Sequence, residues 1–262
     1  MEIGASVPTL LGALMIVSFM LGLVTMTYWK IAKHGEFKPF FGGVLVYAVF
    51  GLCVKGILDM TVLSVLPLGM WSYTAYQVVS VVAAETLGRY MGFQLLHKDR
   101  TDPRDGVSFG LGFGTLEAIL TVGLTSLMYR SYAVAIKDGS ASELLDVLSG
   151  ADRAELSDAL AEVAALTEAD CIWAIAERAV RLTMHTALAV TAMASFRLGQ
   201  KRLLWIGAAA EAVAILPISL YQSGVNLPQW VGEAVLMLGT AAITVLAVRT
   251  FREMDTEAVH HL

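Results

Sequence analysis

The sequence predicts an all-α, multi-pass membrane protein, and three observations carry this prediction. Hydrophobic residues make up 56% of the 262 residues, charged residues only 16%, and the mean hydropathy is +0.66. These values lie outside the range usual for soluble globular domains. Apolar runs long enough to cross about 30 Å of hydrocarbon as a helix recur along the chain. Barrel strands would be shorter and alternate in polarity, so the sequence favours a helical bundle.

We predict seven transmembrane helices within one domain that covers residues 1–262. In chain order the spans cover residues 8–28, 40–62, 71–97, 107–129, 171–196, 203–222 and 229–249. The first span has no basic segment before it and no small-residue cleavage signal after it, so we expect a retained helix. Cys53 and Cys171 lie in or beside spans, which predicts neither a disulfide framework nor a zinc ribbon.

Basic residues gather in alternate loops, and this asymmetry predicts the orientation of the chain. Eleven of them follow spans one, three, five and seven: Lys30, Lys33, Lys38, Lys98, Arg100, Arg104, Arg197, Lys201, Arg202, Arg249 and Arg252. The opposite loops hold only Arg130, Lys137 and Arg153. We therefore expect the N-terminus outside, the C-terminus in the cytoplasm, and a location in the cell membrane, in a bacterium the plasma membrane.

The longest stretch outside the predicted spans is an acidic extracytoplasmic segment, residues 130–170. It accounts for much of the formal net charge of −5, so that charge gives no reason to expect a nucleic-acid partner. Leucine and valine recur at helical spacing within it, which indicates an amphipathic surface helix. The residues that form this pattern are Leu156, Leu160, Val163 and Leu166. Such a helix would lie on the outer leaflet or cover the bundle, and the alternative is a solvated acidic connector.

Four ionisable residues fall near the middle of four separate apolar spans: Glu85, Glu117, His185 and Glu211. An ionised side chain at the centre of a membrane is unfavourable by about 3 kcal/mol or more, so such groups normally face the interior of a bundle. Their similar depth predicts a polar site assembled between helices. This site is the candidate for chemistry.

Glu85 has a potential partner on its own helix. Arg89 follows four residues later, so the two side chains can pair on one helix face, which would also explain them as a purely structural pair. Gly88 and Gly92 share this face, and small residues allow close helix approach. Glu85 is therefore expected to face protein.

Glu117 and Glu211 have no positively charged neighbour at helical spacing. Gly106, Gly110 and Gly114 form a ridge of small residues that should bury Glu117 against another helix. A lone buried carboxylate must be protonated, paired across helices or bound to a cation. All three possibilities stay open for these two residues.

The fifth span adds Glu177, Arg178 and Arg181 to His185. Glu177 and Arg181 can pair across one turn, whereas Arg178 and His185 share a face. A histidine and carboxylates at one depth can hold Zn²⁺, whose bound water a nearby glutamate can deprotonate for peptide hydrolysis. The alternative is a neutral histidine hydrogen-bonded within the bundle. No HExxH motif occurs in the sequence.

Three segments carry a resemblance to a known family. They are Ala84-Glu85-Thr86-Leu87-Gly88-Arg89-Tyr90, Phe109-Gly110-Leu111-Gly112-Phe113-Gly114-Thr115-Leu116-Glu117-Ala118, and Glu177-Arg178 followed by His185. In this order they resemble the YhfC-like intramembrane metalloproteases, relatives of the prenyl-protease and bacteriocin-processing membrane proteases. The chain departs from the family pattern at Ala84, usually a second glutamate, and at Phe113, usually a histidine.

The resemblance implies a metal-dependent peptidase that cleaves a membrane-embedded or lipidated peptide. Glu85 would be the general base and Arg89 its partner, while Glu117 and His185 would form the metal or oxyanion site, with Zn²⁺ as cofactor. The expected partners are membrane lipids and a membrane-embedded peptide or protein substrate, without nucleic acid. Two alternatives stay open. One is an inactive relative that binds a peptide or membrane partner, and the other is a proton-coupled carrier that uses Glu85, Glu117 and Glu211 as a relay.

Overall fold

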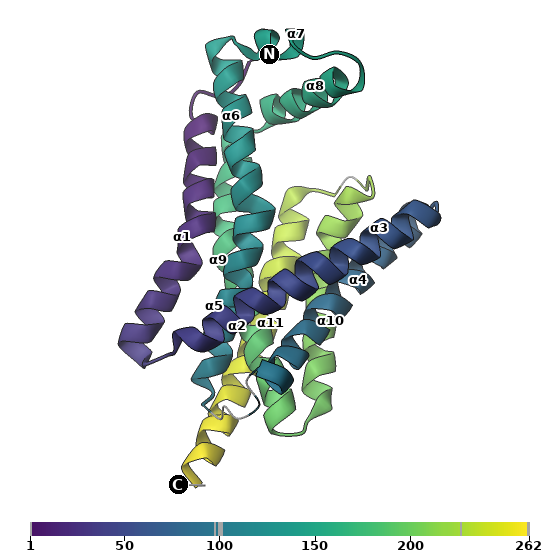
Figure 1. The fold of residues 1–262 in the computed structure, drawn as a ribbon. Coiled ribbons are helices and arrows are strands. Elements are labelled where there is room, and N and C mark those ends of the chain that lie inside the picture. The colour runs from purple at the N-terminus through teal and green to yellow at the C-terminus, as the bar shows by residue number, and fades with distance from the viewer. Residues whose placement is uncertain (1, 97, 99–101, 226, 261–262) are drawn as a thin grey trace. The chain divides into compact units, whose positions relative to one another are not determined.

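The computed structural model describes residues 2–96, 98, 102–225 and 227–260, and these residues form helices and no strand (Figure 1). The predicted all-α class is therefore confirmed. Within the described residues, five helices are long and apolar enough to cross a membrane, and they coincide with predicted spans one, two, four, six and seven. These five helices are Val7–Lys33, Phe37–Val65, Arg104–Asp138, Lys201–Gln222 and Gln229–Thr256.

The two remaining predicted spans, 71–97 and 171–196, are also helical. They correspond to α4 (Met70–Met91) with its extension η2 (Gly92–Leu96), and to α9 (Glu168–Arg197), while residue 97 lies outside the described residues. Both helices carry several polar and charged side chains, which lower their mean hydropathy. Whether they cross the membrane stays a prediction, as do the orientation of the chain and the side on which residues 130–170 lie.

Within the described part of the chain, three of the long helices contain a π-helical stretch. In chain order the elements are α1 (Val7–Lys33), α2 (Phe37–Val46), η1 (Tyr47–Val54), α3 (Lys55–Val65), α4, η2, α5 (Arg104–Ala118), η3 (Ile119–Gly123), α6 (Leu124–Asp138), α7 (Ala141–Asp146), α8 (Gly150–Ala165), α9, α10 (Lys201–Gln222) and α11 (Gln229–His260). Helix α2 continues through η1 into α3, α4 continues into η2, and α5 continues through η3 into α6. The stretches η1, η2 and η3 are π-helical, a geometry that is rare and often occurs near functional sites.

The described residues form two compact units, of which the first comprises residues 1–21 and 118–179. Its core combines apolar residues of α1, α6, α8 and the beginning of α9: Val7, Leu11, Ala133, Ile136, Leu160, Val163 and Cys171. In Figure 1, α8 lies against α6. Leu160 and Val163 are fully buried in this core, so the predicted amphipathic helix exists and its apolar face packs on protein.

The second unit comprises residues 22–117 and 180–262 and contains Glu85, Glu117, His185 and Glu211. Within it, α4 packs against η1 and α10, and α10 packs against α11. The glycine ridge of α5 lies directly on α9, as predicted. A Cβ on Gly110 would stand 2.5 Å from Thr186 Cα and 2.9 Å from Ala189 Cβ. No larger residue fits between the two backbones at this point.

The glycines of α4 also lie at close contacts. A Cβ on Gly88 would stand 2.8 Å from Phe50 Cβ, and one on Gly92 would stand 2.8 Å from Phe109 Cζ. The face of α4 that carries Glu85 is therefore turned toward protein, as the sequence predicts.

The long helix of α2, η1 and α3 contacts different neighbours at its two ends. Gly43 of α2 lies against the backbone oxygen of Phe109 in α5. In α3, Lys55 pairs with Asp59 at 2.5 Å and donates to Gln77 of α4 at 3.0 Å. Tyr76 of α4 donates to Asp59 at 2.9 Å. Lys55 and Asp59 thus neutralise each other, and Gln77 and Tyr76 of α4 complete their hydrogen bonds.

The close approach of α5 and α9 can be tested with one substitution and a matched control. We expect Gly110→Ala to lower the unfolding free energy by about 1–3 kcal/mol, because the added methyl group overpacks the helix contact. Gly56→Ala is the control, since a Cβ at Gly56 meets no atom within 4 Å. Thermal unfolding of the two purified variants in the same detergent measures the difference. Equal melting temperatures would contradict the packing described here.

Candidate functional site

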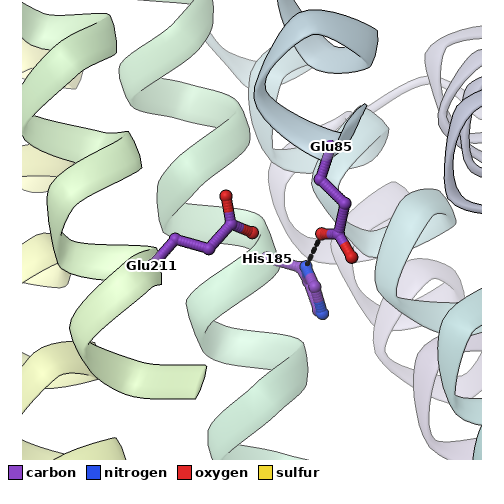
Figure 2. A group of neighbouring side chains, drawn as sticks. All are labelled: Glu85, His185 and Glu211. Carbon is purple, nitrogen blue, oxygen red and sulfur yellow. Dashed lines mark ion pairs between the residues drawn. The ribbon is translucent and has the colours of Figure 1, made fainter. Parts of the chain in front are cut away.

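Three buried side chains from three helices meet in the second unit. Glu85 comes from α4, His185 from α9 and Glu211 from α10, and one ligand atom from each lies within 4.8 Å of the others. Figure 2 shows the three side chains directed toward one another, with Glu85 Oε2 3.7 Å from His185 Nδ1. Their exposed fractions are 8%, 2% and 1%. The structure therefore brings together three of the four ionisable residues that were predicted to share one depth.

Arg89 holds the two carboxylates together. Its guanidinium binds Glu211 through two hydrogen bonds, from Nη1 to Oε2 at 2.9 Å and from Nη2 to Oε1 at 2.8 Å. Nη2 also donates to Glu85 Oε2 at 2.5 Å. The predicted pair of Glu85 and Arg89 is confirmed, and Glu211 obtains its counter-ion across helices. Because all three groups are buried, their mutual neutralisation is required for the unit to hold them.

The same arginine nitrogen also approaches His185. Arg89 Nη2 lies 2.9 Å from His185 Nδ1, and because a guanidinium can only donate, a hydrogen bond between them requires Nδ1 to be the acceptor. Nη2 thus has three acceptors within 2.9 Å but only two hydrogens to offer. Both hydrogens of Nη2 are therefore in use, and two carboxylate oxygens and an imidazole nitrogen surround this one atom.

Glu117 lies on the opposite side of the imidazole. Its Oε2 is 3.9 Å from His185 Nε2, and the residue is 8% exposed. The Cβ position of Gly114, one turn before Glu117, lies 3.2 Å from His185 Cβ, so the glycine ridge sets the approach of Glu117 to the histidine. His185 therefore stands between Glu117 on one side and the group of Glu85, Arg89 and Glu211 on the other.

Two aromatic residues complete the wall of the site. The Phe113 ring lies 4.4 Å from Arg89 Cζ, a cation–π geometry, and 5.4 Å from the His185 ring. Tyr47 packs edge-on against Phe113 at 5.0 Å. The sequence places Phe113 one turn before Glu117, so its position on the same face was predictable. The contact of Tyr47, the first residue of η1, with Phe113 could not be predicted from the sequence.

The other predicted polar residues of α9 are distributed over both units. Glu177 and Arg178 belong to the first unit and pair with each other, Nη2 to Oε1 at 3.0 Å. Arg181 belongs to the second unit, as does His185. None of the three is part of the group of Glu85, His185 and Glu211. The predicted pairing of Glu177 with Arg181 stays a prediction.

The donor set suits a divalent metal in its chemistry. One imidazole nitrogen and two carboxylate oxygens are ligand types that Zn²⁺ accepts, although sets with two or three histidines are more common. The position between the three ligand atoms, however, is where Arg89 Nη2 stands. A metal fits this donor set only when that nitrogen moves aside.

The three π-helical stretches all lie close to this site along the chain. η1 begins at Tyr47, η2 begins three residues after Arg89, and η3 begins two residues after Glu117. A π-helical turn changes which residues share a helix face, because its hydrogen bonds run from i to i+5. Regular α-helical spacing therefore predicts which residues share a helix face only as far as the start of each π-helical stretch.

The role of Arg89 as counter-ion predicts a large effect on stability. We expect Arg89→Met to lower the unfolding free energy by about 3–5 kcal/mol, because it leaves two buried carboxylates without their counter-ion. The double variant Arg89→Met/Glu211→Leu should recover part of this loss, since one of the uncompensated charges is gone. Thermal unfolding in detergent measures both variants. A double variant less stable than Arg89→Met would argue against the pairing.

Comparison with known proteins places the chain in a family. The model of the YhfC intramembrane metalloprotease family matches residues 17–236. The uncharacterized membrane protein YhfC of Bacillus subtilis (strain 168) is 32% identical over 136 residues, which are 49% of this chain and 52% of the relative. The match thus spans about half the length of that relative. No solved structure matches the chain. Since the family model covers most of the sequence, including Glu85, Glu117, His185 and Glu211, the chain belongs to the YhfC intramembrane metalloprotease family.

Proposed function

We propose that this protein hydrolyses a peptide bond of a membrane-embedded or lipidated peptide, with a divalent metal as cofactor. The observation that carries the proposal is the buried group of Glu85, His185 and Glu211 in a chain of a metalloprotease family. Ionisable residues between membrane helices are functional candidates in general, because their burial is otherwise unfavourable. Membrane lipids surround the protein, and the bacterial plasma membrane is the location that we propose.

We assign His185 and Glu211 as ligands of Zn²⁺ and Glu85 as the general base. His185 and Glu211 are almost completely buried, whereas Glu85 is the most exposed of the three, and a general base has to meet water. The metal, when bound, supplies a Lewis acid that lowers the pKa of a coordinated water and polarises a carbonyl. Glu85 would accept the proton of the attacking water at its carboxylate, which α4 places beside His185 and Glu211.

Glu117 has two possible roles. The family resemblance assigns it to the metal together with His185. Its distance of 3.9 Å from Nε2 also supports a role as the group that orients the imidazole, because metal-bound histidines usually direct their second nitrogen toward a carboxylate. In the second case His185 uses Nδ1 for the metal and Nε2–H for Glu117. The two roles lead to different metal contents in single variants.

The position of Arg89 favours a second candidate function. A guanidinium between Glu85, His185 and Glu211 neutralises the site without a metal. In that form the protein would be a relative that binds a peptide or membrane partner and does not cleave it. The carrier alternative loses its main argument, because Glu85 and Glu211 both have Arg89 as counter-ion.

The peptidase proposal predicts that Glu85→Gln abolishes cleavage while the metal content is retained. Without a carboxylate at this position, no group takes the proton of the attacking water, and loss of a general base lowers the rate about 10²–10⁴-fold. The measurement is mass spectrometry of new peptide termini in membranes of cells that express wild-type protein or Glu85→Gln. Glu253→Gln, an exposed site on α11, is the control and should behave as wild type. Identical termini in cells with wild type and Glu85→Gln would refute the proposal.

The assignment of the metal ligands predicts a difference between two conservative variants. Glu211→Gln should lose bound zinc, whereas Glu117→Gln should retain most of it, with affinity reduced by about 10- to 100-fold if Glu117 orients the imidazole. Elemental analysis of the purified proteins at a range of free zinc concentrations measures the stoichiometry. The opposite order, with zinc lost in Glu117→Gln and kept in Glu211→Gln, would assign the metal to the Nε2 side of His185.

A further inference from the structure

We infer that Arg89 competes with the metal for one position, and that metal binding displaces its guanidinium toward a small neighbouring pocket. The inference rests on the metal site of the proposed function and adds a condition for its occupancy. In its present position Arg89 Nη2 lies 2.5 Å from Glu85 Oε2, 2.8 Å from Glu211 Oε1 and 2.9 Å from His185 Nδ1. Glu211 Oε1 and His185 Nδ1 are the proposed ligand atoms, and Glu85 Oε2 belongs to the proposed general base.

A metal ion and this nitrogen cannot occupy the site together. Zn²⁺ binds nitrogen and oxygen ligands at about 2.0–2.2 Å, so an ion held by His185 and Glu211 would need nearly the position that Nη2 now has. Two non-bonded atoms cannot approach that closely, and both carry positive charge. The carboxylates therefore bind either Arg89 or a metal ion.

The structure offers the guanidinium an alternative place. Arg89 also lines a small pocket between α4, α9 and α10, which is partly open and has a volume of about 10 Å³, enough for about one water molecule. The lining residues are Thr86, Arg89, Leu188, Thr191, Ala192, Leu203, Leu204, Gly207 and Ala208. Most of them are apolar or small, and all belong to the second unit. Since Arg89 already lines this pocket, rotation of its side chain directs the guanidinium there, and the lining side chains must move to admit it.

The pocket also contains polar groups that can receive the guanidinium. The hydroxyls of Thr86 and Thr191 donate to Glu211 and to the Ala187 carbonyl, and each oxygen keeps lone pairs that can accept. In the present position Arg89 Nε is buried without a hydrogen-bond partner, so this position leaves one donor unsatisfied. A guanidinium that moves toward the pocket loses its hydrogen bonds to the two carboxylates and gains the hydroxyls of Thr86 and Thr191 as acceptors.

Phe113 opposes this movement. Its ring lies 4.4 Å from Arg89 Cζ and stabilises the guanidinium between the carboxylates. A side chain without a ring at this position would weaken the hold on Arg89. The residue at position 113 therefore sets how easily a metal displaces the arginine.

The inference is tested by zinc titration of purified variants in detergent, with bound zinc measured by elemental analysis and by the rise in melting temperature. Ala208→Leu fills the pocket and should weaken zinc binding by about tenfold or more, since the displaced guanidinium loses its place. Ala209→Leu is the matched control, because Ala209 is the exposed neighbour on α10 and does not line the pocket. Phe113→Leu should bind zinc about 2- to 30-fold more tightly than wild type, the range that a cation–π contact accounts for.

Removal of the competitor should have the largest effect. Arg89→Gln should bind zinc more tightly than wild type, and zinc should raise its melting temperature more, because the ion replaces the missing positive charge. The opposite signs expected for Ala208→Leu and Phe113→Leu separate competition from general damage to the site.

The outcomes also separate this inference from the proposed function. Tight zinc binding that is equal in wild type, Ala208→Leu and Phe113→Leu, or weaker in Arg89→Gln, would overturn the competition and leave the peptidase proposal intact. Zinc binding by Arg89→Gln but not by wild type would support the competition and count against a metal-dependent wild-type enzyme. If neither protein binds zinc, removal of the arginine does not open a metal site, and both proposals fail.

Discussion

The ion pair of Arg89 with Glu211 and Glu85 is the constraint on which the second unit depends. Hydrocarbon supplies no water to solvate these charges, so each of them must find its partner within the protein. One guanidinium satisfies both carboxylates and joins α4 to α10, and His185 connects the same point to α9. The glycines of α5 then allow its backbone to approach α9 closely enough for Glu117 and Phe113 to reach the histidine and the arginine.

The sequence predicts the helices and the burial of the site residues well, because both follow from simple rules. Long apolar runs must be helical in lipid, and glycines at helical spacing lie where helices touch, as at Gly110 and Gly88. The sequence could not predict that Arg89 turns to Glu211 as well as to Glu85. That contact depends on how α4 and α10 pack, and nothing on either helix encodes the distance between them.

Phe113 connects the chemistry of the site to the sequence of this chain. In the family pattern that the sequence resembles, a histidine usually occupies this position, whereas here a phenyl ring contacts the Arg89 guanidinium. The ring offers no ligand atom, but it stabilises a cation that neutralises the carboxylates. In our proposals, the peptidase and the metal-free binding protein differ in which cation lies between Glu85, His185 and Glu211. The relative affinity of the site for the two cations would then decide between the two proposed functions.

The π-helical stretch η1 allows one long helix to pack against α5 at one end and α4 at the other. An α-helix repeats its faces in a fixed phase, and a turn with hydrogen bonds from i to i+5 shifts that phase by one residue. Before the shift, Gly43 meets the backbone of α5; after it, Lys55 and Asp59 meet α4. Deleting one residue within η1 would restore regular phase, and it would turn the ion pair of α3 away from Gln77 and Tyr76. The extra residue therefore acts as a rotational spacer between the part of the helix that builds the site and the part that anchors it.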